Sequence, residues 1–400
     1  MTAPAAEPVS GTRGFLPAVE GLRAAAALGV VLTHVALQTG YTDGVAGRLL
    51  ARFDLAVAVF FALSGFLLWR GHAAAAHGLR AEPEAAPYYR SRLVRIMPAY
   101  LLTVVAVLTL LPDAHSADRA VWLANLTLTQ VFVPKTLIAG LTQMWSLSVE
   151  MAFYLVVPLL AVLVAKVSLR LRVPVIAGVA LLSFGWGYLP IPAYHGANPL
   201  NWLPAYASWF AVGMLLAESM FRPYGWAHRL ARQRSILMAV AVVAFVVAAS
   251  PLAMPGGHQH ATLGQFIVRT ALGAVIAGAL LAPLVLDAPN GRHRVLASAP
   301  MVTLGRWSYG LFLWHLAALD MVLAMIGQTS FPGALPVVMV LTTTFGFAVA
   351  AVSYALLEEP CRLALRRWEA RRQEALLTSP SRGSSAGRRS RDPGSRRRGR

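Results

Sequence analysis

The apolar stretch QMWSLSVEMAFYLVVPLL, residues 143–160, carries one carboxylate and several hydroxyl groups among hydrophobic residues. Ser146, Glu150 and Tyr154 follow one another at intervals of four residues, so on a helix they lie along one face. Charged groups are costly in lipid, so we expect this face to border a bundle interior or a water-filled cavity. Glu150 is interpreted as a functional carboxylate, and structural pairing with a buried cation is the alternative.

A cation and an imidazole share a second apolar segment, residues 16–38. Arg23 and His34 are eleven residues apart, close to three helical turns, which places them on one face roughly 16 Å apart along the axis. An arginine near the cytoplasmic end can hold a phosphate-bearing donor, and a deeper histidine can transfer protons. Glu20 lies at a spacing that allows it to pair with Arg23. The alternative is an arginine that reaches the membrane surface and a histidine that hydrogen-bonds to a neighbouring helix.

A pair of arginines precedes a third apolar segment in the sequence YYRSRLVRIMPAY. Arg92 and Arg95 are three residues apart and lie on one face of a short amphipathic helix. Two guanidinium groups in this arrangement can clamp a phosphate group of a nucleotide-like donor. Ordinary anchoring of positive charge on the cytoplasmic side explains the pair almost as well.

A second histidine lies in a late apolar segment, GRWSYGLFLWHLAALD. Ser308 and His315 are seven residues apart and share a helical face, which favours a polar cavity common to several helices. The histidines lack the spacings typical of metal ligands, so no metal site is predicted. Phosphate-binding and dinucleotide-binding glycine motifs are also absent from the sequence, and no tightly bound cofactor is expected.

Another segment, FFALSGFLLWR, is interpreted as a packing element. Ser64 and Gly65 are small residues inside an aromatic run, and this pattern is typical of close helix crossings in membranes.

The composition indicates which elements position these residues. The 400 residues are 57% hydrophobic and only 13% charged, with a mean hydropathy of +0.59, which is too apolar for a soluble domain of this length. Apolar windows of helical length predict an all-α, polytopic membrane bundle of about ten transmembrane helices. These windows are 16–38, 52–69, 97–112, 144–165, 173–189, 202–219, 235–253, 266–286, 302–326 and 334–357.

The distribution of basic residues predicts the orientation of this bundle. Alternate loops 70–96, 166–172, 221–234 and 287–301 contain 14 Lys and Arg residues, whereas the intervening loops contain three. Because basic residues concentrate in cytoplasmic loops, both termini are predicted to be cytoplasmic in a multi-pass protein of the cell membrane.

The residues from Cys361 onward form a strongly basic tail. They include 13 arginines and three acidic residues, and much of the segment is rich in Arg, Ser and Gly without an apolar period. Such a composition predicts a disordered cytoplasmic tail over residues 361–400 that interacts with anionic membrane lipids. Nucleic-acid binding is not favoured, and a simple excess of positive charge on the cytoplasmic side is the alternative.

Taken in order, these segments resemble the membrane-bound acyltransferase-3 family of bacterial O-acyltransferases. The matching pieces are EGLRAAAALGVVLTH, FFALSGFLLW, YRSRLVRIMPAY, MWSLSVEMAFYLVVP and SYGLFLWHLAAL. The resemblance covers a transmembrane domain over residues 15–360, between a short cytoplasmic N-terminus over 1–14 and the basic tail.

The resemblance implies an enzyme that transfers an acyl group from cytoplasmic acyl-CoA, typically acetyl-CoA, to a hydroxyl group. The acceptor would be a sugar, a glycolipid or a small molecule. His34 would be the catalytic histidine, acting as a general base or carrying a transient acyl group, with Glu150 orienting it or stabilising its imidazolium form. The other residues expected to bind donor or acceptor are Arg23, Arg92, Arg95, Trp145, Ser146, Ser308 and His315.

Two other classes of protein share the intramembrane charges. A proton-coupled secondary transporter also places Glu, His, Arg and Asp inside its bundle, although its internal repeat symmetry is missing from this sequence. A structural or assembly subunit would use the same residues as interhelical ion pairs.

Overall fold

The computed structural model describes residues 15–114, 116–191, 196–222, 225–253, 261–287, 293–327 and 334–378. Over these ranges the chain is helical and contains no strand, which confirms the predicted all-α fold. The α-helices are α1 (Pro17–Gln38), α2 (Gly44–Ala51), α3 (Ala56–Ala76), α4 (Ala85–Leu110), α5 (Arg119–Leu126), α6 (Met144–Ala165), α7 (Leu169–Ser183), α8 (Ala207–Ser219), α9 (Trp226–Ala231), α10 (Arg234–Ala248), α11 (Leu263–Val285), α12 (Ala299–Met325), α13 (Leu335–Ser353) and α14 (Glu359–Thr378).

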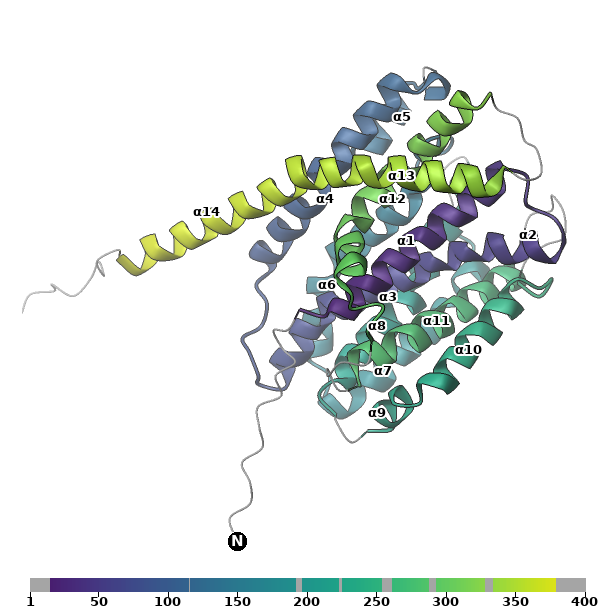
Figure 1. Cartoon of the computed structure of the whole chain (residues 1–400). Coiled ribbons are helices and arrows are strands. Elements are labelled where there is room, and N and C mark those ends of the chain that lie inside the picture. Colours follow the sequence, from purple (N-terminus) through teal and green to yellow (C-terminus); the bar gives the residue numbers. More distant parts are fainter. Residues whose placement is uncertain are drawn as a thin grey trace, which may run out of the picture.

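The helices pack in two groups that meet at α1. In one group α1 lies against α12, and α12 lies against α13; in the other, α3 lies against α8 and α11, and α11 against α10. Contacts between α1 and α3 join the groups, and Figure 1 shows α1, α3, α11 and α10 side by side through the body of the molecule. Helix α6 contacts both α3 and α4, so it completes one side of the space around α1 and α3.

The crossing of α3 and α8 depends on two glycines. A Cβ atom on Gly65 would lie 2.1 Å from the carbonyl oxygen of Phe210, and one on Gly213 would lie 1.9 Å from the carbonyl oxygen of Ala62. The two backbones therefore approach as closely as small residues allow, which confirms the close crossing predicted from Ser64 and Gly65.

Each of the ten predicted apolar windows overlaps a helix, but three of these helices are short. Seven helical stretches within the described ranges are long and apolar enough to cross a membrane: Pro17–Gln38, Gly44–Ala76, Ala85–Leu110, Met144–Ala165, Leu263–Val285, Ala299–Met325 and Leu335–Glu374. Helices α7, α8 and α10 have 15, 13 and 15 residues, below the ~20 residues that span a bilayer. α8 is short because Leu203–Tyr206, with Pro204, forms a 3₁₀ turn in front of it.

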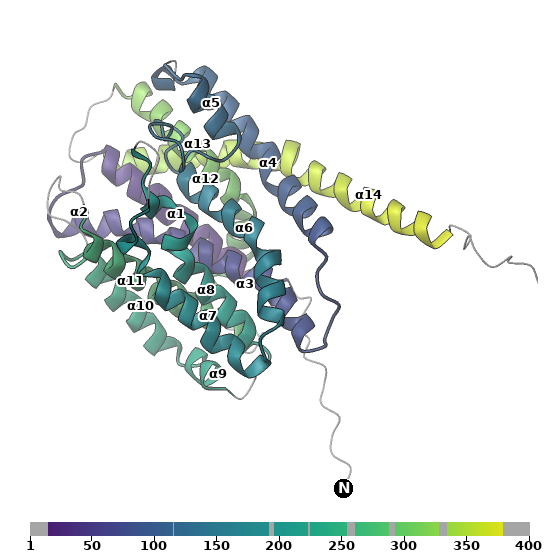
Figure 2. The same ribbon diagram turned by 180° about the vertical axis from the view of Figure 1, so that it is seen from behind.

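The basic tail differs from the prediction of disorder over residues 361–378, where the structure has helix α14. Figures 1 and 2 show α14 continuing from the end of α13 and extending past α4 beyond the bundle. Leu, Ala, Arg, Glu and Gln, all strong helix formers, dominate this stretch. On α4, Arg90 lies 3.5 Å from the carboxylate of Glu369 and 5.0 Å from the ring centre of Trp368, which docks the helix. The rest of the predicted disordered tail lies outside the described residues.

Candidate active site

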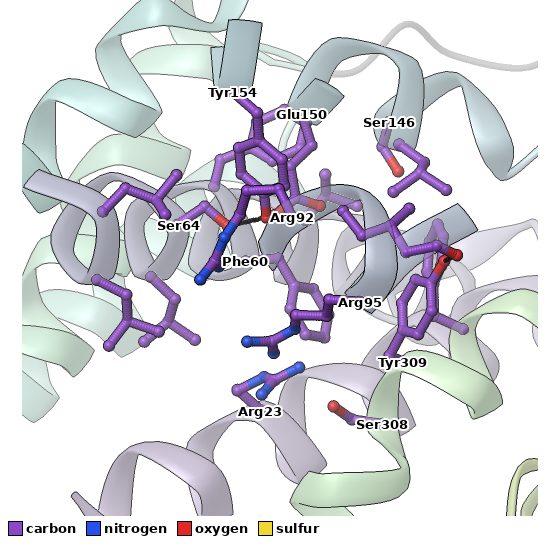
Figure 3. A pocket seen from close by; sticks show the side chains of 18 residues that line it. Arg23, Phe60, Ser64, Arg92, Arg95, Ser146, Glu150, Tyr154, Ser308 and Tyr309 are labelled. Atoms are coloured by element: carbon purple, nitrogen blue, oxygen red, sulfur yellow. Dashed lines mark hydrogen bonds between the residues drawn. The ribbon is translucent and has the colours of Figure 1, made fainter. Parts of the chain in front are cut away.

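A cavity of about 80 Å³ opens between α1, α3, α4, α6 and α12. Figure 3 shows its polar side chains converging from these helices. Its lining combines three arginines, one carboxylate and hydroxyl groups with an apolar wall: Arg23, Val57, Phe60, Phe61, Leu63, Ser64, Leu67, Leu68, Arg92, Arg95, Ile96, Ser146, Leu147, Glu150, Tyr154, Ser308, Tyr309 and Phe312. We refer to it as the Glu150 cavity.

The carboxylate of Glu150 is held by two hydroxyl donors. The hydroxyl of Ser64, from α3, donates to Oε1 of Glu150, and the phenol of Tyr154, one turn further along α6, donates to the same oxygen at 2.6 Å. The predicted polar face of Ser146, Glu150 and Tyr154 therefore borders a cavity. Ser64 does more than the packing predicted for it, because its hydroxyl fixes the carboxylate.

Three guanidinium groups share the cavity with this one carboxylate. Arg23 comes from α1 and donates to Glu20 at 3.1 Å, so the predicted pair is present. Arg92 and Arg95 come from α4, and Figure 3 shows both directed into the space that Arg23 also faces. Cations therefore outnumber the carboxylates around this buried space, which favours binding of an anionic ligand.

Ser146 and Ser308 line the cavity from opposite helices. Each hydroxyl donates to a backbone carbonyl of its own helix segment, Ser146 to Gln143 at 3.1 Å and Ser308 to Gly305 at 2.8 Å. Their oxygen atoms remain available as acceptors. Trp145 does not line the cavity; its ring lies 5.1 Å from that of Tyr206 and 6.4 Å from that of Phe61, which does line it.

The two histidines form a separate pair. The ring centres of His34 and His315 are 5.0 Å apart, and Nδ1 of His34 lies 3.3 Å from Nε2 of His315. His315 is fully buried. Neither histidine belongs to the lining of the Glu150 cavity, so the shared face of Arg23 and His34 serves two neighbouring polar sites.

The acceptors around the pair select one tautomer for each ring. Nδ1 of His315 lies 2.8 Å from the carbonyl oxygen of Phe312, and Nδ1 of His34 lies 2.8 Å from that of Val30. A carbonyl oxygen can only accept, so each Nδ1 carries the proton when the ring is neutral. The single Nδ1–H of His34 is then shared between the carbonyl oxygen of Val30 and Nε2 of His315, and Nε2 of His34 keeps a lone pair that has no hydrogen-bond partner among the described residues.

The expected contact between Glu150 and His34 is absent. The carboxylate of Glu150 accepts from two hydroxyl groups, and His34 is oriented by a backbone carbonyl and by His315 instead. Both residues had been placed correctly on inward helical faces, but the periodicity of two separate helices does not determine which inward residues meet.

Phe312 connects the two sites. Its ring lines the Glu150 cavity, while its carbonyl oxygen accepts a hydrogen bond from Nδ1–H of His315. Tyr309 also lines the cavity. Its phenol donates a hydrogen bond to the carbonyl oxygen of Ile96 at 2.9 Å, which links α12 to α4. Sequence reasoning missed both residues, although Ser308, Phe312 and His315 share the helical spacing that could have shown them on one face.

Comparison with known proteins finds a family model that matches most of the chain. A family model described as an acyltransferase domain matches residues 16–357. The chain is similar to the acyltransferase MdmB of Streptomyces mycarofaciens, with 29% identity over 92% of this chain and 96% of that protein.

Two further relatives are more distant. The O-acetyltransferase OatA of Staphylococcus aureus is 23% identical over 87% of this chain, which spans only 57% of the length of OatA. The exopolysaccharide production protein ExoZ of Rhizobium meliloti is 28% identical over 87% of this chain and 98% of that protein. No protein of solved structure shows a significant match.

Proposed function

The chain belongs to the acyltransferase family that this model describes, and from that premise we propose that it moves an acetyl group from acyl-CoA to an acceptor hydroxyl group. The protein is an O-acyltransferase with several membrane-spanning helices. We also propose which donor and acceptor it uses and which residues carry out the transfer. The observation that supports this proposal is the Glu150 cavity, where three arginines surround one carboxylate beside a histidine pair.

We assign the donor to the arginine side of the site. Arg23, Arg92 and Arg95 offer planar guanidinium groups to an anionic donor, and Ser146 and Ser308 offer hydroxyl groups beside them. The name of OatA supports an acetyl group. The name of ExoZ supports a carbohydrate acceptor, and glycolipids or small hydroxylated molecules are acceptors of the same chemistry.

We assign the chemistry to His34. Its Nε2 takes the proton of the acceptor hydroxyl as the oxygen attacks the thioester carbonyl carbon. The carbon–sulfur bond then breaks, the sulfur receives the proton from the imidazolium ring, and an ester and free CoA are formed. His315 supports this step because its neutral Nε2 accepts from Nδ1 of His34, which stabilises the protonated ring.

The donor is proposed to enter from the cytoplasm. Support comes from the excess of Lys and Arg in alternate loops, which predicts a cell-membrane protein with both termini cytoplasmic. The basic segment from Cys361 onward is proposed to interact with anionic lipid headgroups, and nucleic acid is not a proposed partner.

The proposal is tested with inverted membrane vesicles, which expose the cytoplasmic face. Vesicles that contain the wild-type protein should transfer label from radiolabelled acetyl-CoA to a lipid, a glycan or a soluble product. Vesicles with His34→Ala should not, provided that the variant is inserted and unfolds at the wild-type temperature. Accumulation of a labelled solute without covalent modification would support the transporter instead.

A further inference from the structure

A second cavity of about 370 Å³ adjoins the Glu150 cavity and has no role in the site described above. The two cavities share three lining residues, Arg23, Arg95 and Tyr309. The remainder of its lining comes mainly from α14 and the turn that joins α13 to α14, with smaller contributions from the start of α1 and from α12: Phe15, Glu20, Arg306, Tyr354, Glu358, Glu359, Arg362, Leu363 and Arg366. We call this space the vestibule.

Basic residues dominate the vestibule. Five arginines line it against three glutamates, and one of these glutamates, Glu20, is already paired with Arg23. Arg306 and Arg366 are exposed, so their charges meet a ligand that arrives from solution. A concave surface with this balance attracts a ligand that carries several negative charges.

The vestibule also contains a buried acceptor without a donor. Residues Tyr354–Glu358 form a single π-helical turn, a feature that is frequent at functional sites, and both its first and its last residue line the vestibule. Glu358 is only 5% exposed, and its buried Oε1 has no hydrogen-bond partner among the described residues. A ligand for this space should therefore offer N–H or O–H donors as well as negative charge.

The two cavities differ in size, so each can hold a different part of such a ligand. Pockets that bind drug-sized ligands measure about 300–1,000 Å³, a range that includes the vestibule at about 370 Å³ but not the Glu150 cavity at about 80 Å³. The joined cavities match a molecule with a large polyanionic head, a narrow arm with amide groups and a small reactive end.

We propose that the vestibule binds the phosphorylated adenosine head of acyl-CoA, with Arg306, Arg362 and Arg366 on its phosphate groups. The diphosphate that follows this head lies toward Arg23 and Arg95, which line both cavities, and the N–H and O–H groups of the pantetheine arm are the donors available to Glu358. The acyl end extends through the Glu150 cavity toward the neighbouring histidine pair, which Phe312 connects to this cavity. This inference rests on the proposed function and assigns to its donor a site that the residues of the Glu150 cavity do not supply.

The test compares donors with different heads: acetyl-CoA, acetyl-3′-dephospho-CoA and acetyl-pantetheine. The variant Arg362→Gln/Arg366→Gln should raise KM for acetyl-CoA about tenfold or more, because charge-assisted hydrogen bonds to phosphate are lost. Its KM for acetyl-pantetheine should equal that of the wild type. The control Arg367→Gln/Arg371→Gln removes the same charge from the same helix at positions outside the vestibule lining, and it should leave every KM unchanged.

Equal KM values for acetyl-CoA in the two double variants would overturn the inference while the proposed function stands. An anionic lipid headgroup offers similar chemistry, so the assay is run in vesicles of phosphatidylcholine with and without phosphatidylglycerol. If Arg362→Gln/Arg366→Gln changed only the response to phosphatidylglycerol, the vestibule would be a lipid site and the inference would be wrong.

A binding measurement keeps the two proposals separate. The purified wild-type protein should bind adenosine 3′,5′-bisphosphate, and Arg362→Gln/Arg366→Gln should weaken that binding about tenfold or more. Binding of this kind without any acetyl transfer would support the vestibule and contradict the proposed function. Equal affinity in the wild type and the variant, or no binding by either, would overturn the vestibule as the nucleotide site.

Discussion

Replacing Gly65 by alanine should separate α3 from α8 and disturb the carboxylate of Glu150 at the same time. The added Cβ would lie 2.1 Å from the carbonyl oxygen of Phe210, whereas Cβ atoms essentially never come closer than 3.0 Å to another heavy atom. The obstacle is backbone, which cannot rotate aside as a side chain can. The two helices must therefore move apart by almost 1 Å at their closest point.

The loss of folding free energy caused by this displacement can be given to an order of magnitude. Overpacking by one methyl group in a well-packed interior costs about 1–3 kcal/mol, and the rigid contact places Gly65→Ala at the upper end. Because Ser64 precedes this residue and donates to Glu150, the displacement should also lower acetyl transfer. Thermal unfolding of the purified protein and the transfer assay measure the two effects.

Gly178→Ala is the matched control. Gly178 lies in α7, and a Cβ atom there would meet nothing within 4 Å. The same substitution should be neutral or stabilise the protein by up to about 1 kcal/mol, because alanine favours helix more than glycine does. Wild-type stability and activity in Gly65→Ala would refute the reasoning that the α3–α8 crossing positions Ser64 at the carboxylate.

Three further predictions follow from individual contacts. Glu218→Ala should destabilise the protein by about 3–5 kcal/mol, because the buried guanidinium of Arg172, 3.8 Å away, loses its carboxylate partner. Thermal unfolding measures this effect, and an unchanged unfolding temperature would contradict it. Tyr154→Phe should cost about 1–3 kcal/mol through its lost hydrogen bond to Glu150, and stability equal to the wild type would show that this bond contributes nothing. His34→Ala should lower kcat roughly hundredfold or more, and His315→Asn should lower it by less while leaving KM for acetyl-CoA unchanged. A changed KM with a normal kcat in His315→Asn would assign His315 to donor binding instead.

Positions within one helix were predictable from the sequence. The interval of four residues between Ser146, Glu150 and Tyr154 places them on one face, and the cost of charge in lipid turns that face inward. The same reasoning placed Arg92 and Arg95 together, and the structure brings both into one cavity with Arg23. Helical periodicity and burial energetics therefore account for most of the cavity's polar residues.

Contacts between helices were not predictable in the same way. Ser64 meets Glu150 across 86 residues of sequence, and His34 meets His315 across 281. A hydrophobic pattern gives the inward face of each helix but not its rotation or height relative to its neighbours, which packing determines. This is why Glu150 was expected beside His34, and why the partner of the Ser64 hydroxyl was not identified.

Helix length was also misjudged where short turns interrupt an apolar run. The window 202–219 is largely apolar, yet only Ala207–Ser219 forms α8, because the residues before it adopt 3₁₀ turns. In the opposite direction, composition predicts disorder where the arginine-rich α14 forms. Its helix formers and its contacts with Arg90 outweigh its low hydrophobicity.

The most direct test of the central claim measures both products of transfer in one sample of inverted vesicles. Acyl transfer initiated by His34 predicts that free CoA and the acetyl ester form in equal amounts with the wild-type protein. Both products should be lost in His34→Ala protein that unfolds at the wild-type temperature. Formation of the ester at the wild-type rate by that variant would contradict the claim that His34 carries the reaction.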